Sequence, residues 1–145
     1  MIRQATPTDF PELSDIFHDA NLIAHPFIDP DFIVTKKFRP QDEKLPLSKS
    51  YVYEVNGDIH GFVSVSQDQI NGLFVRVDRQ RQGVGSQLLS YLKDRHEQLA
   101  LRCFVDNYQA QRFYHSQGFE ITEEKRFEAL EYDEFIMRWS RLATH

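Results

Sequence analysis

The chain has 145 residues, 41% of them hydrophobic, and this length and composition exclude a disordered segment and predict one domain over residues 1–145. Its net charge of −5 argues against nucleic-acid binding, which needs clustered Lys and Arg side chains to contact phosphates. No apolar run approaches the roughly 20 residues of a membrane span and the start lacks a secretory segment, so we expect a cytoplasmic protein with no membrane partner.

The N-terminal third is predicted to contain a strand, a helix and a long connection. Residues 2–5 are a short strand candidate, and apolar residues recur at helical spacing from Phe10 to Phe17, which predicts a helix of about three turns. Four of the six prolines lie between residues 21 and 50, around a short apolar piece. This pattern predicts a loop, a short helix and a second loop, and a connection of this length is typical of a binding surface. We therefore expect substrate contacts there.

Three strands are predicted in the middle of the chain. The β-rich runs 51–55 and 59–65 are joined through Asn56, Gly57 and Asp58. Asn-Gly is a strong hairpin signal because both turn residues need a positive φ. A third run, 70–77, extends the hairpin into an antiparallel meander.

The C-terminal half alternates strands and helices before it ends in two strands. A helix of about three turns is expected from Gly85, because Leu88, Leu89 and Leu92 recur at helical spacing. The remaining expected elements are a strand at 99–105 covered on both faces, a helix at 107–117 with Gly118 as a left-handed cap, and strands at 119–127 and 135–139. This order predicts an α+β or mixed α/β fold.

The stretch from Asp78 to Ser86, between a strand and a helix, is the most informative. Gly83 and Gly85 let backbone N–H groups converge on an anion at a helix N-terminus, where the unpaired donors and the helix dipole favour negative charge. The expected ligand is a pyrophosphate. The alternative is that this stretch is an ordinary glycine-containing turn that binds no ligand. ATP and NAD are disfavoured, because a Walker A loop needs Lys where Ser86 stands and the dinucleotide fingerprint needs Gly or Ala where Leu88 stands.

Two motifs resemble those of the GNAT superfamily of N-acetyltransferases. Residues 80–85, Q-R-Q-G-V-G, match the acyl-CoA signature Q/R-x-x-G-x-G/A, and residues 107–119 are similar to the second motif, N-x-x-A-x-x-F-Y-x-x-x-G-F. The resemblance covers a core from about residue 51 to residue 119, and the N-terminal third looks like that of small bacterial members thought to modify protein lysines. It implies a mixed, mostly antiparallel sheet of about six or seven strands flanked by about four helices, with a splayed strand pair for acyl-CoA.

The resemblance implies acetyl-CoA as co-substrate. The backbone of Leu73, Phe74 and Val75 would pair with the pantetheine arm, which can add to a splayed strand as a pseudo-strand, and Asn107 would stand near that arm. The amides that would bind the pyrophosphate are those of Gln80, Arg81, Gln82, Gly83, Val84, Gly85 and Ser86. The side chains of Arg79 and Arg81 either add phosphate contacts or are solvated loop arginines.

Acetyl transfer to an amine needs a neutral amine, a stabilised oxyanion and a proton for the departing thiolate. Tyr114 matches the tyrosine that is the general acid in many family members, and a core tyrosine is the alternative. A backbone N–H near Leu73 is implied as the oxyanion donor. The expected substrate contacts are His25 and Phe27 in the long connection and Asn71 on the strand before the phosphate loop.

The general base is left open, because residues 69–73 carry no carboxylate. Asn71 or His25 could order a water molecule that takes the proton, or Glu54 or Asp68 could act across the cleft. A lysine amine can also lose its proton before it binds, so a dedicated base is not obligatory. The single cysteine, Cys103, is predicted to be an inert core residue, which disfavours an acyl-cysteine mechanism. The six histidines lack metal-ligand spacing, so no metal is expected.

The expected reaction is direct transfer of an acetyl group to a primary amine through a tetrahedral intermediate. A protein lysine or an N-terminal amine is the first acceptor expected, and a small amine is the second. Seven carboxylates between residues 120 and 134 either form a solvated hairpin face or steer a cationic amine toward the site. A non-catalytic acyl-CoA-binding or protein-interaction module of the same fold is the alternative. The protein is expected to be a monomer or a homodimer, and the sequence does not distinguish the two.

Overall fold

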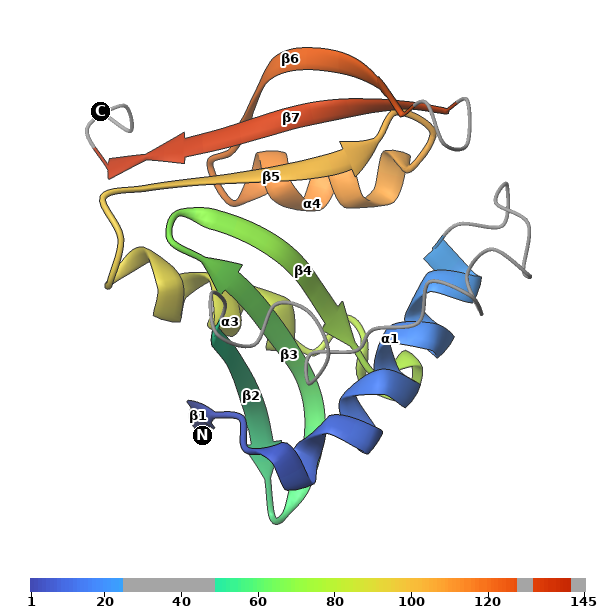
Figure 1. Ribbon diagram of the computed structural model, residues 1–145, viewed down its shortest axis with the longest axis vertical. Coiled ribbons are helices and arrows are strands. Elements are labelled where there is room, and N and C mark those ends of the chain that lie inside the picture. Colours follow the sequence, from blue (N-terminus) through green and yellow to red (C-terminus); the bar gives the residue numbers. More distant parts are fainter. Residues whose placement is uncertain (25–48, 128–131, 142–145) are drawn as a thin grey trace.

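The computed structural model describes residues 1–24, 49–127 and 132–141, in which seven strands form one sheet (Figure 1). The strand order is β1-β2-β3-β4-β5-β7-β6, and every neighbouring pair is antiparallel except β4 and β5. The described residues also contain three α-helices and two short 3-10 helices. The predicted mixed, mostly antiparallel sheet is confirmed, while the helix expected between residues 21 and 50 falls largely outside the described residues.

The strands and helices follow the predicted order with shifted boundaries. The strands are β1 (Ile2–Gln4), β2 (Lys49–Val55), β3 (Asp58–Ser66), β4 (Gln69–Val75), β5 (Gln98–Phe104), β6 (Glu120–Phe127) and β7 (Tyr132–Ser140). The helices are η1 (Pro7–Asp9), α1 (Phe10–Ala24), η2 (Val77–Arg79), α3 (Val84–Lys93) and α4 (Tyr108–Ser116). The strand predicted to reach residue 77 ends at Val75, because the chain turns into η2 there. The first helix is longer than the three turns expected, with 15 residues.

Helices cover both faces of the sheet (Figure 1). α1 packs on one face through a small core that contains Phe10, Leu13 and Phe62, and Phe17 contacts Phe74 of β4 edge to face at 5.0 Å between ring centroids. α3 and α4 pack on the other face around a larger core that includes Leu88 and Phe119. β4 therefore lies between α1 and the α3–α4 layer.

Among the described residues β5 has fully buried side chains on one face only, so the prediction that both faces are buried is wrong. Leu99, Leu101 and Cys103 are at most 7% exposed and belong to the core beneath α3 and α4. Arg102, which alternates with them, is exposed. Successive side chains of a strand point to opposite faces, so the opposite face of β5 carries polar and partly exposed residues.

β4 and β5 are joined by a single rung of the parallel ladder. Gln69 pairs with Ala100, and the amide of Ala100 donates to the carbonyl of Asp68 at 2.9 Å. Beyond this point the two strands diverge (Figure 1), so within the described ranges the β4 edge that faces β5 has no partner strand from Ile70 to Val75. The splayed strand pair that the resemblance implied is confirmed.

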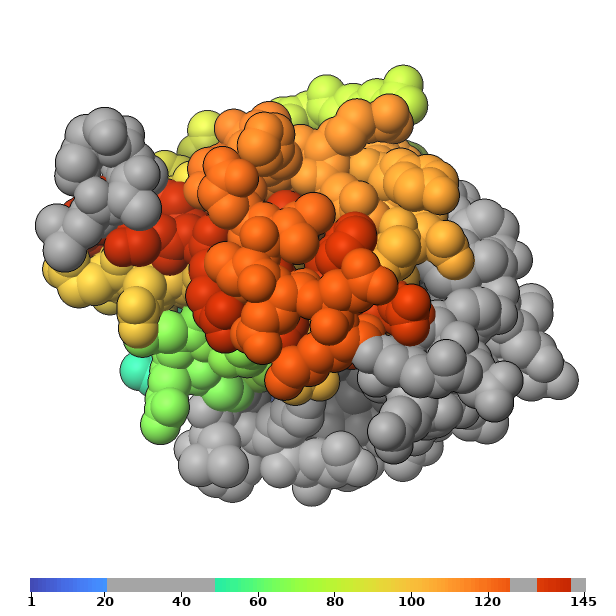
Figure 2. Space-filling model, turned by 90° about the horizontal axis from the view of Figure 1, so that it is seen from above, coloured from blue at the N-terminus to red at the C-terminus, as the bar shows by residue number. Residues whose placement is uncertain are grey.

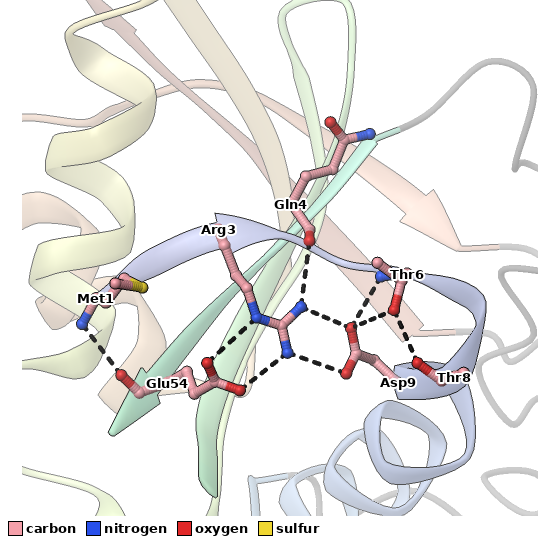
Figure 3. Close-up of polar contacts among 7 residues, drawn as sticks. All are labelled: Met1, Arg3, Gln4, Thr6, Thr8, Asp9 and Glu54. Atoms are coloured by element: carbon pink, nitrogen blue, oxygen red, sulfur yellow. Dashed lines mark hydrogen bonds and ion pairs between the residues drawn. The ribbon is translucent and has the colours of Figure 1, made fainter. Parts of the chain in front are cut away.

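Arg3 joins the N-terminal strand to η1 and β2 (Figure 3). Its guanidinium donates to both Asp9 carboxylate oxygens, at 2.8 and 3.1 Å, and to both Glu54 oxygens, at 3.3 and 3.0 Å. The hydrogen bonds from Arg3 lower the pKa of Asp9 to about 2 and also lower the pKa of Glu54. Because Glu54 is held in this network and easily ionised, it is poorly suited to be the general base.

Asp9→Asn is expected to lower the free energy of unfolding at pH 7 by about 1 kcal/mol, the scale of a solvent-screened ion pair. A carboxylate with a lowered folded-state pKa stabilises the fold above its unfolded pKa, near 4, and this contribution disappears as the pH falls through about 2. The difference between the wild type and the variant should therefore shrink from pH 5 to pH 2 in urea unfolding. Asp58→Asn, at an exposed position, is the control, and an equal effect there would contradict the network's contribution.

Candidate active site

The loop between η2 and α3 presents unpaired backbone donors. Gly83 caps α3 in a left-handed conformation with φ at +84°, and a Cβ built on it would meet nothing within 4 Å. The first amide of this turn with an acceptor is that of Gln87, which donates to the Gly83 carbonyl at 3.0 Å. The amides of Val84, Gly85 and Ser86 thus donate to no acceptor in the described part of the chain. Unpaired amides at a helix N-terminus form a ready anion-binding site.

Arg79 adds a second unsatisfied donor close to this loop. Its Nε atom is buried and has no hydrogen-bond partner among the described residues. A buried donor without an acceptor costs free energy, and a phosphate oxygen would remove that cost. The donors at this end of α3 therefore fit a phosphate-bearing ligand, and Arg79 is a stronger candidate than the sequence suggested.

Gly85 brings the two sequence motifs into contact. A Cβ at this position would lie 3.1 Å from the Cζ atom of Phe113 on α4, so the ring packs against the backbone of α3. Gln117, at the end of α4, also donates to the Ser86 hydroxyl at 3.1 Å. The absence of a side chain at Gly85 therefore lets α4 approach the phosphate loop closely.

Asn107 begins α4, as expected, and its side-chain oxygen accepts a hydrogen bond from the Ala110 amide at 3.2 Å. This contact makes Asn107 the N-cap of the helix that carries Tyr114. Its amide also donates to the Phe104 carbonyl at 3.0 Å, which fixes the start of α4 to the end of β5. A structural function at this position is established, whereas contact with a ligand stays a prediction.

Tyr114 lies on α4 between aromatic neighbours. Its ring contacts Phe113 and Phe119 edge to face, at centroid distances of 5.2 and 5.8 Å. Burial raises the pKa of the phenol well above its usual value, and the nearby Cys103 adds to this effect. The hydroxyl makes no hydrogen bond to another described residue. A protonated phenol with a free hydroxyl can donate a proton and cannot act as a base near neutral pH.

Cys103 is chemically inert in this environment. Burial raises the pKa of its thiol to about 12, and Glu134 contributes to the shift. The Sγ atom lies 3.7 Å from the Phe104 carbonyl and is surrounded by the core. Because the thiolate is the nucleophilic form, this side chain is unsuited to an acyl-cysteine intermediate.

The structure places the predicted ligand-binding residues on β4, on the loop between η2 and α3 and at the start of α4. Leu73, Phe74 and Val75 form the open edge of β4, and η2 leads from that edge to the phosphate loop. Asn71 is the extra residue of a β-bulge, since Gly72 pairs with Ser64 and Ile70 with Val65. Its amide side chain donates to the Ser66 hydroxyl at 2.8 Å, near the closed end of the cleft. His25 and Phe27 lie outside the described residues.

The carboxylate candidates for the base are already paired. Asp68 lies 2.9 Å from Nδ1 of His96, and Glu54 is bound to Arg3. Glu134, which the sequence analysis treated as one of seven acidic residues in a hairpin, is only 13% exposed. Its position opposite Phe104 could not be read from the spacing of the acidic residues, because it depends on the register of β5 and β7.

Surface grooves formed by the described residues include one beside α4 and one beside α1. One, of about 480 Å³, lies between α4 and β6 and has Ile121 and Met137 in its lining. The other, of about 500 Å³, lies between α1 and η2 and is lined by Glu12, Asp15, Asp19 and Asp78, with Arg76 as its cation. The second groove adds negative potential close to the start of the phosphate loop.

The described residues contain no cluster of three or more His, Cys, Asp and Glu side chains able to hold a metal ion. No helix within the described ranges combines the length and the apolar character needed to cross a membrane.

Comparisons with known proteins agree with this geometry. The family model described as an acetyltransferase (GNAT) domain matches residues 46–121. The chain is 28% identical to the peptidyl-lysine N-acetyltransferase YiaC of Escherichia coli strain K12 over 145 residues, which is 99% of each chain. Among solved structures, the apo form of YjaB from Escherichia coli superposes with a TM-score of 0.80 at 21% identity over 96% of both chains. PaiA N-acetyltransferase from Thermoplasma acidophilum, in complex with coenzyme A, gives 0.79 at 16% identity over 97% of this chain and 98% of that one. These two structural similarities concern the fold.

Gly83→Glu is expected to weaken coenzyme A binding at least tenfold, because a carboxylate would occupy the open space above the unpaired amides and repel the phosphates. Gly83→Ala separates this effect from backbone strain, since it carries the same cost of a positive φ, on the order of 1 kcal/mol, without the charge. Isothermal titration calorimetry of both variants checks the prediction. Equal affinities for the wild type and Gly83→Glu would show that the loop does not hold the phosphates.

Proposed function

The chain belongs to the GNAT family of acetyltransferases, and from this premise we propose that it transfers the acetyl group of acetyl-CoA to a lysine side chain of a protein or peptide. The observation that carries the proposal is the divergence of β4 and β5 beyond one rung, followed by a loop of unpaired amides. An unpaired strand edge suits an amide-bearing arm, and unpaired helix amides suit phosphates. The full-length similarity to a peptidyl-lysine N-acetyltransferase supports lysine as the acceptor.

Acetyl-CoA supplies an activated thioester. The residues of the chain need to bind it, polarise its carbonyl, accept a proton from the amine and donate a proton to the thiolate. The β4 edge from Leu73 to Val75 would align the pantetheine arm, and a backbone N–H of this edge would donate to the carbonyl oxygen as negative charge develops. The amides of residues 83–86, with Arg79, would hold the pyrophosphate at the far end of the arm. Both supports are backbone elements fixed by neighbouring secondary structure.

Tyr114 is the proposed proton donor to the departing thiolate. Its raised pKa keeps it protonated at neutral pH, and its hydroxyl is free of other described partners. A thiolate has a lower pKa than such a phenol, so the transfer depends on a well-aligned hydrogen bond to sulfur rather than on acid strength. The packing of its ring against Phe113 and Phe119 would provide that alignment.

A cationic acceptor suits the charge of the chain. The net charge is −5, and the groove between α1 and η2 has four carboxylates against one cation. Such a field raises the local concentration of a positively charged lysine side chain. The proposal thus predicts that acetylation slows as ionic strength rises.

The test incubates the full chain with acetyl-CoA and, separately, lysine peptides, peptides with only a free N-terminal amine, and small amines. Mass spectrometry reads the products. Acetylation at a lysine Nε atom is the expected result. Acetylation confined to N-terminal or small amines would overturn the acceptor, and coenzyme A binding without any acetylated product would favour the non-catalytic module of the same fold.

Tyr114→Phe is expected to lower kcat by about 100-fold or more, the usual contribution of a positioned proton donor, with coenzyme A affinity nearly unchanged. The substitution removes only the hydroxyl and preserves the aromatic contacts. Steady-state kinetics with the best lysine peptide, together with calorimetry, checks both parts. Tyr108→Phe, at an exposed position on the same helix, is the matched control. Full activity of Tyr114→Phe would exclude Tyr114 as the proton donor.

A further inference from the structure

Glu134 is a carboxylate with an unusual environment for a residue of an acidic hairpin. Its side chain is 13% exposed, whereas those of Glu120 and Glu123 are 72% and 45% exposed. Among the described residues its ionic partner is Arg102, at 3.9 Å, which is too long for a hydrogen bond. Partial burial of a carboxylate disfavours its charged form, and carboxylates with a perturbed pKa are often found at functional sites.

The register of the sheet places Glu134 at the level of the proposed thioester. Gln69 of β4 pairs with Ala100 of β5, and Leu73 is the third β4 residue after Gln69 that pairs with β3. The same count along β5 reaches Cys103, and the next residue, Phe104, pairs with Glu134 on β7. Glu134 therefore lies one strand beyond β5, level with the Leu73 and Phe74 end of β4 and far from the rung at Gln69.

Glu134 and Tyr114 lie on opposite faces of the sheet. Cys103 and its β7 partner Phe135 point into the core that also contacts Tyr114. Because side chains alternate along a strand, Phe104 and Glu134 point to the other face, the one on which α1 packs (Figure 1). A thioester in the cleft would thus have the phenol on one side and the carboxylate on the other.

We propose that Glu134 accepts the proton of the lysine ammonium that reacts at this cleft. This inference rests on the proposed function. Proton transfer from the ammonium to the Glu134 carboxylate leaves a neutral amine, whose lone pair forms the new C–N bond to the acetyl carbonyl carbon. The amine's second proton is lost to water, the C–S bond breaks, and the thiolate takes the Tyr114 proton. Glu134 and Tyr114 then return to their starting states by exchange with water.

The charges around Glu134 set its proton affinity. Burial raises the pKa of Glu134, and Arg102 on β5 opposes that change. On β6 the directly paired residue is Lys125, which is exposed, and on β5 the nearby thiol of Cys103 is neutral because of its raised pKa. A carboxylate with a raised pKa is a better proton acceptor than an exposed glutamate.

The test compares Glu134→Gln with Glu124→Gln, a control on β6, which forms the outer surface in Figure 2. For the lysine peptide that is acetylated fastest, kcat/KM is measured from pH 5.5 to pH 9. Glu134→Gln is expected to lower kcat/KM at pH 7 at least tenfold and to remove the acid limb of the profile. Glu124→Gln should keep the wild-type kcat/KM at pH 7 and the acid limb of the pH profile. Neither variant should change the affinity for coenzyme A.

Glu134→Asp separates proton transfer from packing. It keeps the carboxylate, so it should recover part of the rate and restore an acid limb, even if Glu134→Gln also melts at a lower temperature. A wild-type acid limb retained in Glu134→Gln, or equal losses in the two glutamine variants, would overturn the proposal. In that case an active wild type still leaves the proposed function intact, whereas a wild type that binds coenzyme A without acetylating any peptide contradicts the function itself.

Discussion

The cleft depends on one interaction, the single rung that joins β4 to β5 at Gln69 and Ala100. A fully paired parallel ladder would leave β4 without a free edge, and no rung at all would separate the two halves of the sheet. The pairing of Asp68 with His96 at 2.9 Å, beside the Ala100 amide bond to the Asp68 carbonyl, reinforces the closed end. The divergence beyond it leaves backbone donors and acceptors of β4 without a β5 partner, and an extended ligand that carries amides can bind them.

Helices α3 and α4 pack against each other on one face of the sheet and fix the elements around the site. Gly85 lets Phe113 pack directly on the start of α3, so the helix that carries Tyr114 is held against the loop that presents unpaired amides. Asn107 ties the start of α4 to the end of β5. The glycine motif and the asparagine-to-phenylalanine motif are thus parts of one packed unit, in which a change at either element shifts the other.

The pKa values of three ionisable groups near β5 are all raised. Low solvation raises the pKa of Tyr114, Cys103 and Glu134, because each charged form is disfavoured away from water. The consequences differ with the chemistry of each group. The phenol stays a proton donor, the thiol stays unreactive, and the carboxylate gains affinity for a proton. Arg3 has the opposite effect on Asp9 and Glu54, which are held as anions in a structural network away from the cleft.

The sequence by itself determined the order of the elements, the Asn56-Gly57 hairpin, the left-handed cap at Gly118, and the two motifs, because these follow from local backbone preferences and periodicity. It did not show that Arg102 of β5 is exposed, that Glu54 is bound to Arg3, or that the Glu134 side chain is only 13% exposed. Those features come from strand register and helix packing, which bring together residues far apart in the chain. Only the tertiary structure decided them, since solvation and charge pairing depend on neighbours in space.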